Sequence, residues 1–135
     1  MPNQPNLPLR ISLVAAGLVA IFAVYPLILL WPAGFRWNPP QSEYEQMIAG
    51  LYATLGVFLL RAARDPLRYL SLIWFAVWSS VVHAGIMAVQ AWRAPDERTH
   101  FVGDIALLLG LALVLGVLTA RATAADAGAG SRAAV

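Results

Sequence analysis

The sequence predicts an all-α protein, an antiparallel four-helix transmembrane bundle in one domain. Of its 135 residues, 60% are apolar and only 12% are charged, against about 25% charged residues in an ordinary soluble domain. Four apolar runs approach or exceed the roughly 20 residues that cross a hydrocarbon core about 30 Å thick. The connections between these runs are short, so consecutive helices are expected to be antiparallel neighbours. So little charge excludes a disordered chain and argues strongly against a soluble globule.

The apolar runs set the expected domain organisation. The four transmembrane helices are expected over residues 11–31, 43–60, 69–92 and 101–120. Residues 1–10 precede them as an N-terminal segment on the cytoplasmic side. Residues 121–135 are rich in alanine and glycine and show no periodic apolar face, which predicts a disordered cytoplasmic tail.

Two local signals refine this plan. Pro26 lies inside the first apolar run and should kink that helix, because proline lacks an amide hydrogen and its ring meets the carbonyl four residues earlier. Ser42 and Glu45 have the spacing of a capping box, in which the two side chains satisfy amides at the start of the second helix.

The arginines predict the orientation, since short cytoplasmic loops of membrane proteins carry an excess of positive charge. Six arginines fall on one side of the four runs: Arg10, Arg61, Arg64, Arg68, Arg121 and Arg132. Three fall on the other: Arg36, Arg93 and Arg98. This bias places both termini in the cytoplasm. The arginines lie at the ends of apolar runs and not along one face, so nucleic acid is not an expected partner. The use of arginine and alanine in place of lysine is typical of a GC-rich bacterial genome, so the expected location is a bacterial inner membrane.

One group of polar residues lies unusually deep. His83 is about 13 Å below the outer surface, at a rise of 1.5 Å per residue from the end of its helix. Polar side chains at such depth are costly and often functional. The candidate polar pocket around it comprises His83, Tyr52, Ser79, Ser80, Gln90 and Tyr25. The simplest interpretation is an interhelical hydrogen bond between His83 and Tyr52. The functional one is a pocket for a small amphipathic or aromatic molecule, or a proton-accepting step in transport.

A second group of polar residues forms a candidate outer cluster of Glu45, His100 and Asp104. His100 and Asp104 are four residues apart and share a helix face. These side chains are metal ligands of suitable type, so they are weak candidates for a metal site. The alternative is that Glu45 caps its helix and Asp104 complements the helix dipole. Glu97 and His100 have the E-x-x-H spacing of di-iron bundles, but a second copy is absent from the sequence. No cysteine is present, which excludes thiolate chemistry, and no cofactor is expected.

Small residues four apart allow helices to approach closely. Ala106 with Gly110, and Ala112 with Gly116, form two such pairs on the fourth run. They are candidate contacts for a membrane-protein partner or a second copy of the chain, beside the lipid bilayer itself.

A resemblance adds to this interpretation. The segments 34–45, 78–83 and 100–104 resemble a family of short bacterial inner-membrane proteins of unknown function, whose general plan is similar to that of DoxX-like proteins. The resemblance covers about residues 11–120. It implies a four-helix bundle and carries no established activity, so no catalytic residue is transferred.

The leading functional hypothesis is a small non-enzymatic accessory or interaction subunit, because no catalytic signature is present. The alternative is binding or transport of a small molecule or ion through an outward-facing polar pocket floored by His83. A metal- or quinone-linked redox component is the third. An accessory subunit should tolerate loss of His83 or Asp104, whereas a binding protein should not.

Overall fold

The chain is all-α in a computed structural model that describes residues 6–133. It contains the α-helices α1 (Leu7–Phe22), α2 (Val24–Leu30), α3 (Pro32–Phe35), α4 (Ser42–Ala62), α5 (Leu70–Arg93) and α6 (Asp104–Ala133), and the 3-10 helices η1 (Pro66–Tyr69) and η2 (Pro95–Phe101). No strand occurs among these described residues. The predicted all-α class is therefore confirmed.

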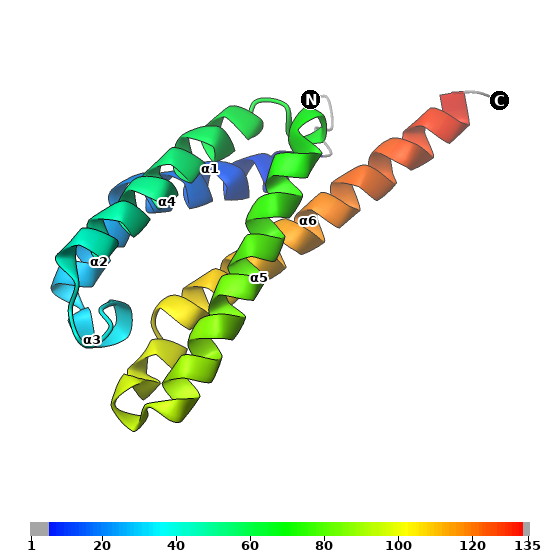
Figure 1. Cartoon of the computed structure of the whole chain (residues 1–135). Helices are drawn as coiled ribbons and strands as arrows, with labels where there is room; N and C mark the ends of the chain where they lie inside the picture. The colour runs from blue at the N-terminus through cyan, green and yellow to red at the C-terminus, as the bar shows by residue number, and fades with distance from the viewer. Residues whose placement is uncertain (1–5, 134–135) are drawn as a thin grey trace.

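The long helices form two antiparallel pairs, α1 with α4 and α5 with α6, which meet at one end and separate toward the other (Figure 1). At the meeting end, Arg10 Nε donates a hydrogen bond of 2.9 Å to the carbonyl of Ala63. The main core lies there and takes buried residues from all four helices, among them Leu9, Leu13, Leu59, Ala62, Ile73, Ala76, Ala112 and Leu115. A smaller core between α5 and α6 continues toward the open end.

Within the first pair, the helices approach closely at two glycines. A Cβ atom on Gly56 would lie 2.6 Å from the carbonyl oxygen of Gly17, and one on Gly17 would lie 2.9 Å from that of Gly56. Glycine is therefore required at both positions for α1 and α4 to touch, as small residues allow at membrane helix crossings. Neither glycine belongs to the small-residue pairs expected from the sequence.

The first helix is bent, as Pro26 predicts. α1 ends at Phe22 and α2 begins at Val24, and their axes differ by 54°. Pro26 has no amide hydrogen to donate to Phe22, and its ring would meet that carbonyl in a straight helix. The bend turns α2 away from the line of α1 and so helps to open the space between the two helix pairs.

The structure supports fewer clear membrane spans than the four expected. Within residues 6–133, the segments Pro66–Arg93 and Pro95–Ser131 are long and apolar enough to cross a membrane, and α1 with α2 makes a third if the bent pair is one span. α4 is not among these segments, and its first turn carries Glu43 and Glu45. A complete four-helix transmembrane bundle is therefore an expectation beyond what these segments show.

The surface is suited to lipid. Many large apolar side chains are exposed along the helices. Together they form a broad apolar surface of a kind that soluble proteins rarely expose. They include Ile11, Phe22, Leu30, Leu51, Val57, Phe58, Phe75, Trp78, Val82, Ile86 and Leu113. Together with the long apolar helices, these residues indicate a membrane protein.

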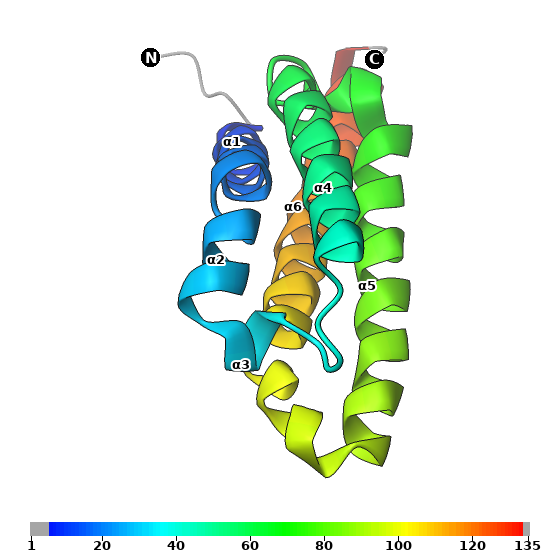
Figure 2. The same cartoon turned by 60° about the vertical axis from the view of Figure 1, so that its left-hand side comes forward.

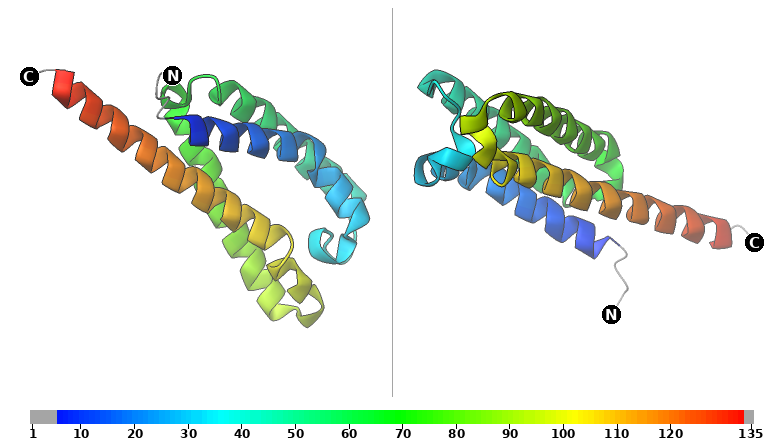
Figure 3. Two further views of the ribbon diagram at one scale, coloured as in Figure 1. Left: turned by 180° about the vertical axis from the view of Figure 1, so that it is seen from behind. Right: turned by 90° about the horizontal axis from the view of Figure 1, so that it is seen from below.

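The C-terminal region differs from its predicted disorder. α6 continues as a helix to Ala133, so the disordered tail expected over 121–135 is wrong for the part that is described, and residues 134–135 lie outside it. Figure 3 shows these last turns extending past the ends of the other helices. Alanine has the highest helix propensity, and the alanine-rich composition that suggested a tail also sustains a helix.

At the other terminus, α1 begins at Leu7, inside the expected leading segment 1–10. Residues 1–5 of that segment also lie outside the described part.

The capping box is also wrong. The residue that precedes α4 is Gln41, and no side chain caps this helix. Ser42 Oγ instead lies 3.2 Å from a carboxylate oxygen of Glu43. Glu45 turns away from the helix start toward Arg36, because a charged partner in the preceding loop forms a stronger interaction than a backbone amide does.

Candidate functional site

A cavity of about 920 Å³ lies between the two helix pairs, where they separate. We call it the interhelical cavity. Its wall takes residues from α1, α2, α4, α5 and α6, and it is mostly apolar. A few polar side chains interrupt this surface, including Tyr52, His83, Gln90, Glu45 and Asp104. Binding sites for small molecules are typically of this kind, with volumes of about 300–1,000 Å³ and a few placed polar groups.

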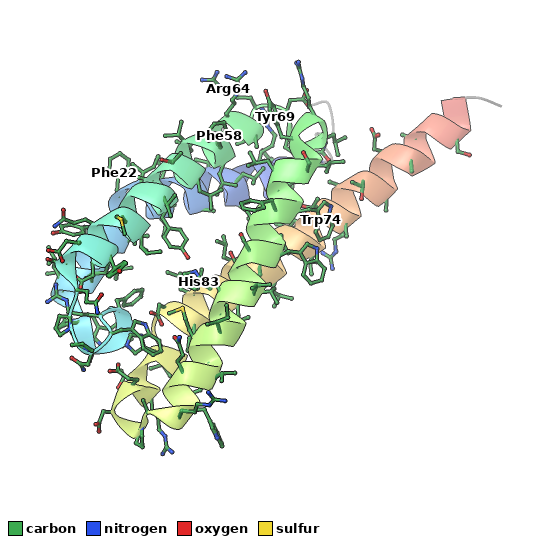
Figure 4. The ribbon with its side chains drawn as sticks, in the orientation of Figure 1. Phe22, Phe58, Arg64, Tyr69, Trp74 and His83 are labelled. Carbon is green, nitrogen blue, oxygen red and sulfur yellow. The ribbon has the colours of Figure 1, made fainter. Side chains whose placement is uncertain are left out.

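His83 and Tyr52 link the two pairs across the interhelical cavity. The Tyr52 hydroxyl lies 2.9 Å from His83 Nδ1, and the two rings are nearly parallel, with 6.2 Å between centroids. Figure 4 shows His83 pointing from α5 into the space between the pairs. The hydrogen bond engages one ring nitrogen of His83 and leaves Nε2 as a further donor or acceptor, according to the tautomer.

One end of the interhelical cavity is closed by residues 31–41, which we call the strap. The strap contains α3 and connects α2 to α4. Figure 2 shows α3 beside the start of α6, and α3 also contacts η2. Gly34 and Gly103 touch through their backbones, so closely that a Cβ atom on Gly103 would overlap the carbonyl of Gly34. The backbone amide of Asn38 donates to Glu97 Oε1 at 3.1 Å.

His100 holds the strap in place through its contact with Trp37. Its side chain is fully buried, and its ring stacks on Trp37 of the strap with 4.1 Å between centroids. The two ring nitrogens face two carboxylates. Nδ1 lies 3.0 Å from Asp104 Oδ2, and Nε2 lies 3.2 Å from Glu97 Oε2. A doubly protonated imidazole can therefore interact with both carboxylates at once.

Asp104 joins this anchor to the interhelical cavity, because it contacts His100 and also lines the wall. Its Oδ2 atom accepts a hydrogen bond of 3.3 Å from Trp37 Nε1. Asp104 stands at the first position of α6, where the unpaired amides and the helix dipole favour negative charge.

Glu45 does not join His100 and Asp104. Its carboxylate pairs with Arg36 of the strap, with Oε1 2.9 Å from Nε and Oε2 3.0 Å from Nη2. The expected outer cluster is therefore divided, and Glu97 takes the place that was assigned to Glu45. Among residues 6–133 no three His, Asp or Glu side chains are grouped so that they could hold a metal ion.

The structure brings together part of the predicted polar pocket. Tyr52, His83 and Gln90 line the interhelical cavity. Ser79 and Ser80 do not, because both hydroxyls donate to the carbonyl of Ala76 in their own helix. Tyr25 is also outside it and is 42% exposed, since the bend before α2 changes the direction in which its residues face.

The two small-residue pairs of α6 have different surroundings. Ala112 is buried in the main core, and Gly116 faces α5, where a Cβ atom would lie 3.6 Å from Val77. This pair already serves contacts within the chain. Ala106 and Gly110 instead line the interhelical cavity, and a Cβ atom on Gly110 would meet nothing within 4 Å.

Sequence reasoning missed three residues of this site. Trp37 has no signal in its local sequence, and Arg36 entered only the count of arginines for orientation. Glu97 had one signal, its three-residue spacing from His100. That spacing places both side chains on one face of a helical turn, but it did not indicate the strap that covers them.

Comparison with known proteins gives one match. No curated protein and no solved structure matches the chain significantly. The likeness to DoxX-like proteins therefore gains no support. A family model, DUF6632, described as a family of unknown function, matches residues 3–135. Since that match covers nearly the whole sequence, the chain belongs to the DUF6632 family.

Proposed function

We propose that this chain is an integral membrane protein that binds a small amphipathic molecule in the interhelical cavity. The observation that carries the proposal is the cavity itself, about 920 Å³ of mostly apolar wall with polar groups at a few points. An apolar wall binds the body of such a molecule by removing its surface from water. His83, Tyr52 and Asp104 supply the hydrogen bonds that fix its polar end.

The structure also changes what the small-residue pairs mean for function. Ala112 and Gly116 are used inside the chain, which weakens the case for an accessory subunit that docks through them. Gly110 is open because the interhelical cavity lies in front of it. An enlarged residue at 110 therefore tests binding in the cavity directly.

The first prediction concerns Gly110→Trp. We expect this change to weaken binding of 1-decanol at least about tenfold, which is about 1.4 kcal/mol, because the indole occupies volume that the alkyl chain needs. Binding is measured by equilibrium dialysis in non-ionic detergent, against the same micelles without protein. The matched control is Gly85→Trp, since Gly85 is an exposed helical glycine with nothing within 4 Å and does not line the cavity.

The two variants make the outcome decisive. Binding that is lost in Gly110→Trp and retained in Gly85→Trp supports the proposal. If the unmodified protein takes up no 1-decanol, or if both variants bind it equally well, the cavity is not a binding site, and an accessory role becomes the better explanation.

We extend the proposal to the membrane topology: four crossings, with both termini on the cytoplasmic side of a bacterial inner membrane. The hydrogen bond between Arg10 and Ala63 supports an even number, because it holds the start of α1 and the end of α4 at the same end of the molecule. If α1 and α2 together cross the membrane, α4 must cross it in the opposite direction, although its first turn is polar. Arg61, Arg64 and Arg68 lie in this same region, as the orientation rule requires of a cytoplasmic end.

The second prediction tests this topology. Reporters that are active only in the periplasm or only in the cytoplasm are fused after Asn6, within the strap at Asn38, after Asp65 and after Ala133. We expect the first, third and fourth positions to report cytoplasm, and Asn38 to report periplasm. Periplasmic signals after both Asp65 and Ala133 would mean three crossings and would overturn the proposed role of α4.

A further inference from the structure

The interhelical cavity has an uneven distribution of charge. Glu45 and Asp104 lie in its wall, whereas no arginine lines it among residues 6–133, and the sequence has no lysine. Glu45 is neutralised by Arg36 outside the wall. Asp104 is therefore the group that determines the sign of charge at this end of the cavity.

Asp104 belongs to a group with more acidic than basic side chains. Asp104 and Glu97 share a single histidine, His100. With both acids ionised, at most one imidazolium leaves at least one net negative charge in this group. The charge has little water around it, because the side chain of His100 is fully buried and those of both acids are mostly buried. In such surroundings a charge attracts an opposite charge more strongly than it does in water.

Asp104 also has acceptor capacity to spare. It accepts from His100 Nδ1, from Trp37 Nε1 and from the backbone amide of Ile105. A carboxylate offers about four lone-pair sites, so about one of them is open to a donor that enters from the cavity. Trp37 and Tyr44 lie in the same wall, and aromatic faces attract cations.

Resting on the proposed function, we infer that the ligand of the interhelical cavity is an amphipathic amine, with its ammonium group on Asp104 and its apolar body between the two helix pairs. An ammonium donates hydrogen bonds and carries the charge that this end of the cavity lacks. A carboxylate or phosphate head group would face a net negative group that offers no donor for it. A neutral alcohol gains the apolar contacts without the ion pair.

The test compares three probes that share one alkyl chain: decylamine, 1-decanol and decanoate. Equilibrium dialysis in non-ionic micelles at neutral pH gives the dissociation constant of each. We expect decylamine to bind at least about tenfold more tightly than 1-decanol, as a charge-assisted hydrogen bond contributes. Decanoate is expected to bind more weakly than the alcohol.

Variants assign the preference to Asp104. In Asp104→Asn we expect the ratio of the 1-decanol to the decylamine dissociation constant to fall to about one, because the neutral amide removes the ion pair. In Asp96→Asn we expect the ratio to stay as in the unmodified protein, since Asp96 is exposed on η2 and does not line the cavity. Far-UV circular dichroism establishes that each variant is folded, and the three-probe comparison needs no variant.

Each outcome separates this inference from the proposed function. Equal binding of decylamine and 1-decanol, or a preference for decanoate, overturns the amine and leaves a binding cavity. A preference for decylamine that persists in folded Asp104→Asn overturns the role of Asp104 and with it the inference. Failure of all three probes to bind overturns the proposed function itself.

Discussion

Replacing His100 with alanine is expected to lower the free energy of unfolding by about 3–5 kcal/mol, the usual cost of removing one partner from a buried ion pair. The ring is fully buried between Glu97 and Asp104, so its loss leaves two carboxylates facing each other without a shared partner. The variant also loses the surface on which Trp37 stacks. Unfolding in mixed micelles titrated with SDS, followed by far-UV circular dichroism, measures the change.

Two further variants show whether charge causes this loss. The double variant His100→Ala with Glu97→Gln removes one of the unpaired carboxylates, and we expect it to be more stable than His100→Ala alone. His83→Ala removes a partly buried ring with one hydrogen-bond partner, and we expect it to cost only about 1 kcal/mol. If His100→Ala lowers the free energy of unfolding by less than about 1 kcal/mol, His100 does not hold the central position between the two acids.

The second large effect is expected for Gly103→Ala, which should lower the free energy of unfolding by about 3 kcal/mol, at the upper end of the cost of overpacking. The added methyl group would overlap the backbone of Gly34, and a backbone cannot rotate aside as a side chain can. The strap must therefore move away from η2, and its contacts with Glu97 and His100 weaken with it.

A control separates this effect from a general cost of alanine. Gly85→Ala adds the same methyl group where nothing lies within 4 Å. It should stabilise α5 slightly, since alanine is favoured over glycine inside a helix by about 1 kcal/mol. The same SDS titration measures both variants. If Gly103→Ala is as stable as Gly85→Ala, the two glycines are not in backbone contact and the strap is held in another way.

Local composition predicted the helical class and the bend, because both depend on neighbours in the chain. Apolar runs mark the long helices, and Pro26 removes a hydrogen bond inside its own run. The same local reasoning failed at the C-terminus, where alanine and glycine suggested a tail and α6 continues instead. It also failed at Glu45, whose capping role was displaced by Arg36, a partner nine residues away that only the shape of the strap brings near.

The candidate site was only partly predictable for a similar reason. The depth of residues along straight helices brought His83 and Tyr52 together, and they are hydrogen-bonded. The same arithmetic placed Tyr25 beside them, but a bend of 54° lies between α1 and α2 and turns that residue outward. The strap has no periodic pattern, so nothing in its sequence predicted that Trp37 would cover His100.

The length of α6 has a mechanical consequence. Its 30 residues span about 45 Å at 1.5 Å per residue, whereas a hydrocarbon core is about 30 Å thick. If α6 crosses the core along its axis, about ten of its residues, roughly 15 Å, extend beyond the hydrocarbon as a rigid spacer. Whatever contacts or is joined to the end of this spacer is held at a fixed distance from the membrane surface. An attached group would turn together with the helices, whereas a flexible tether would let that group move independently.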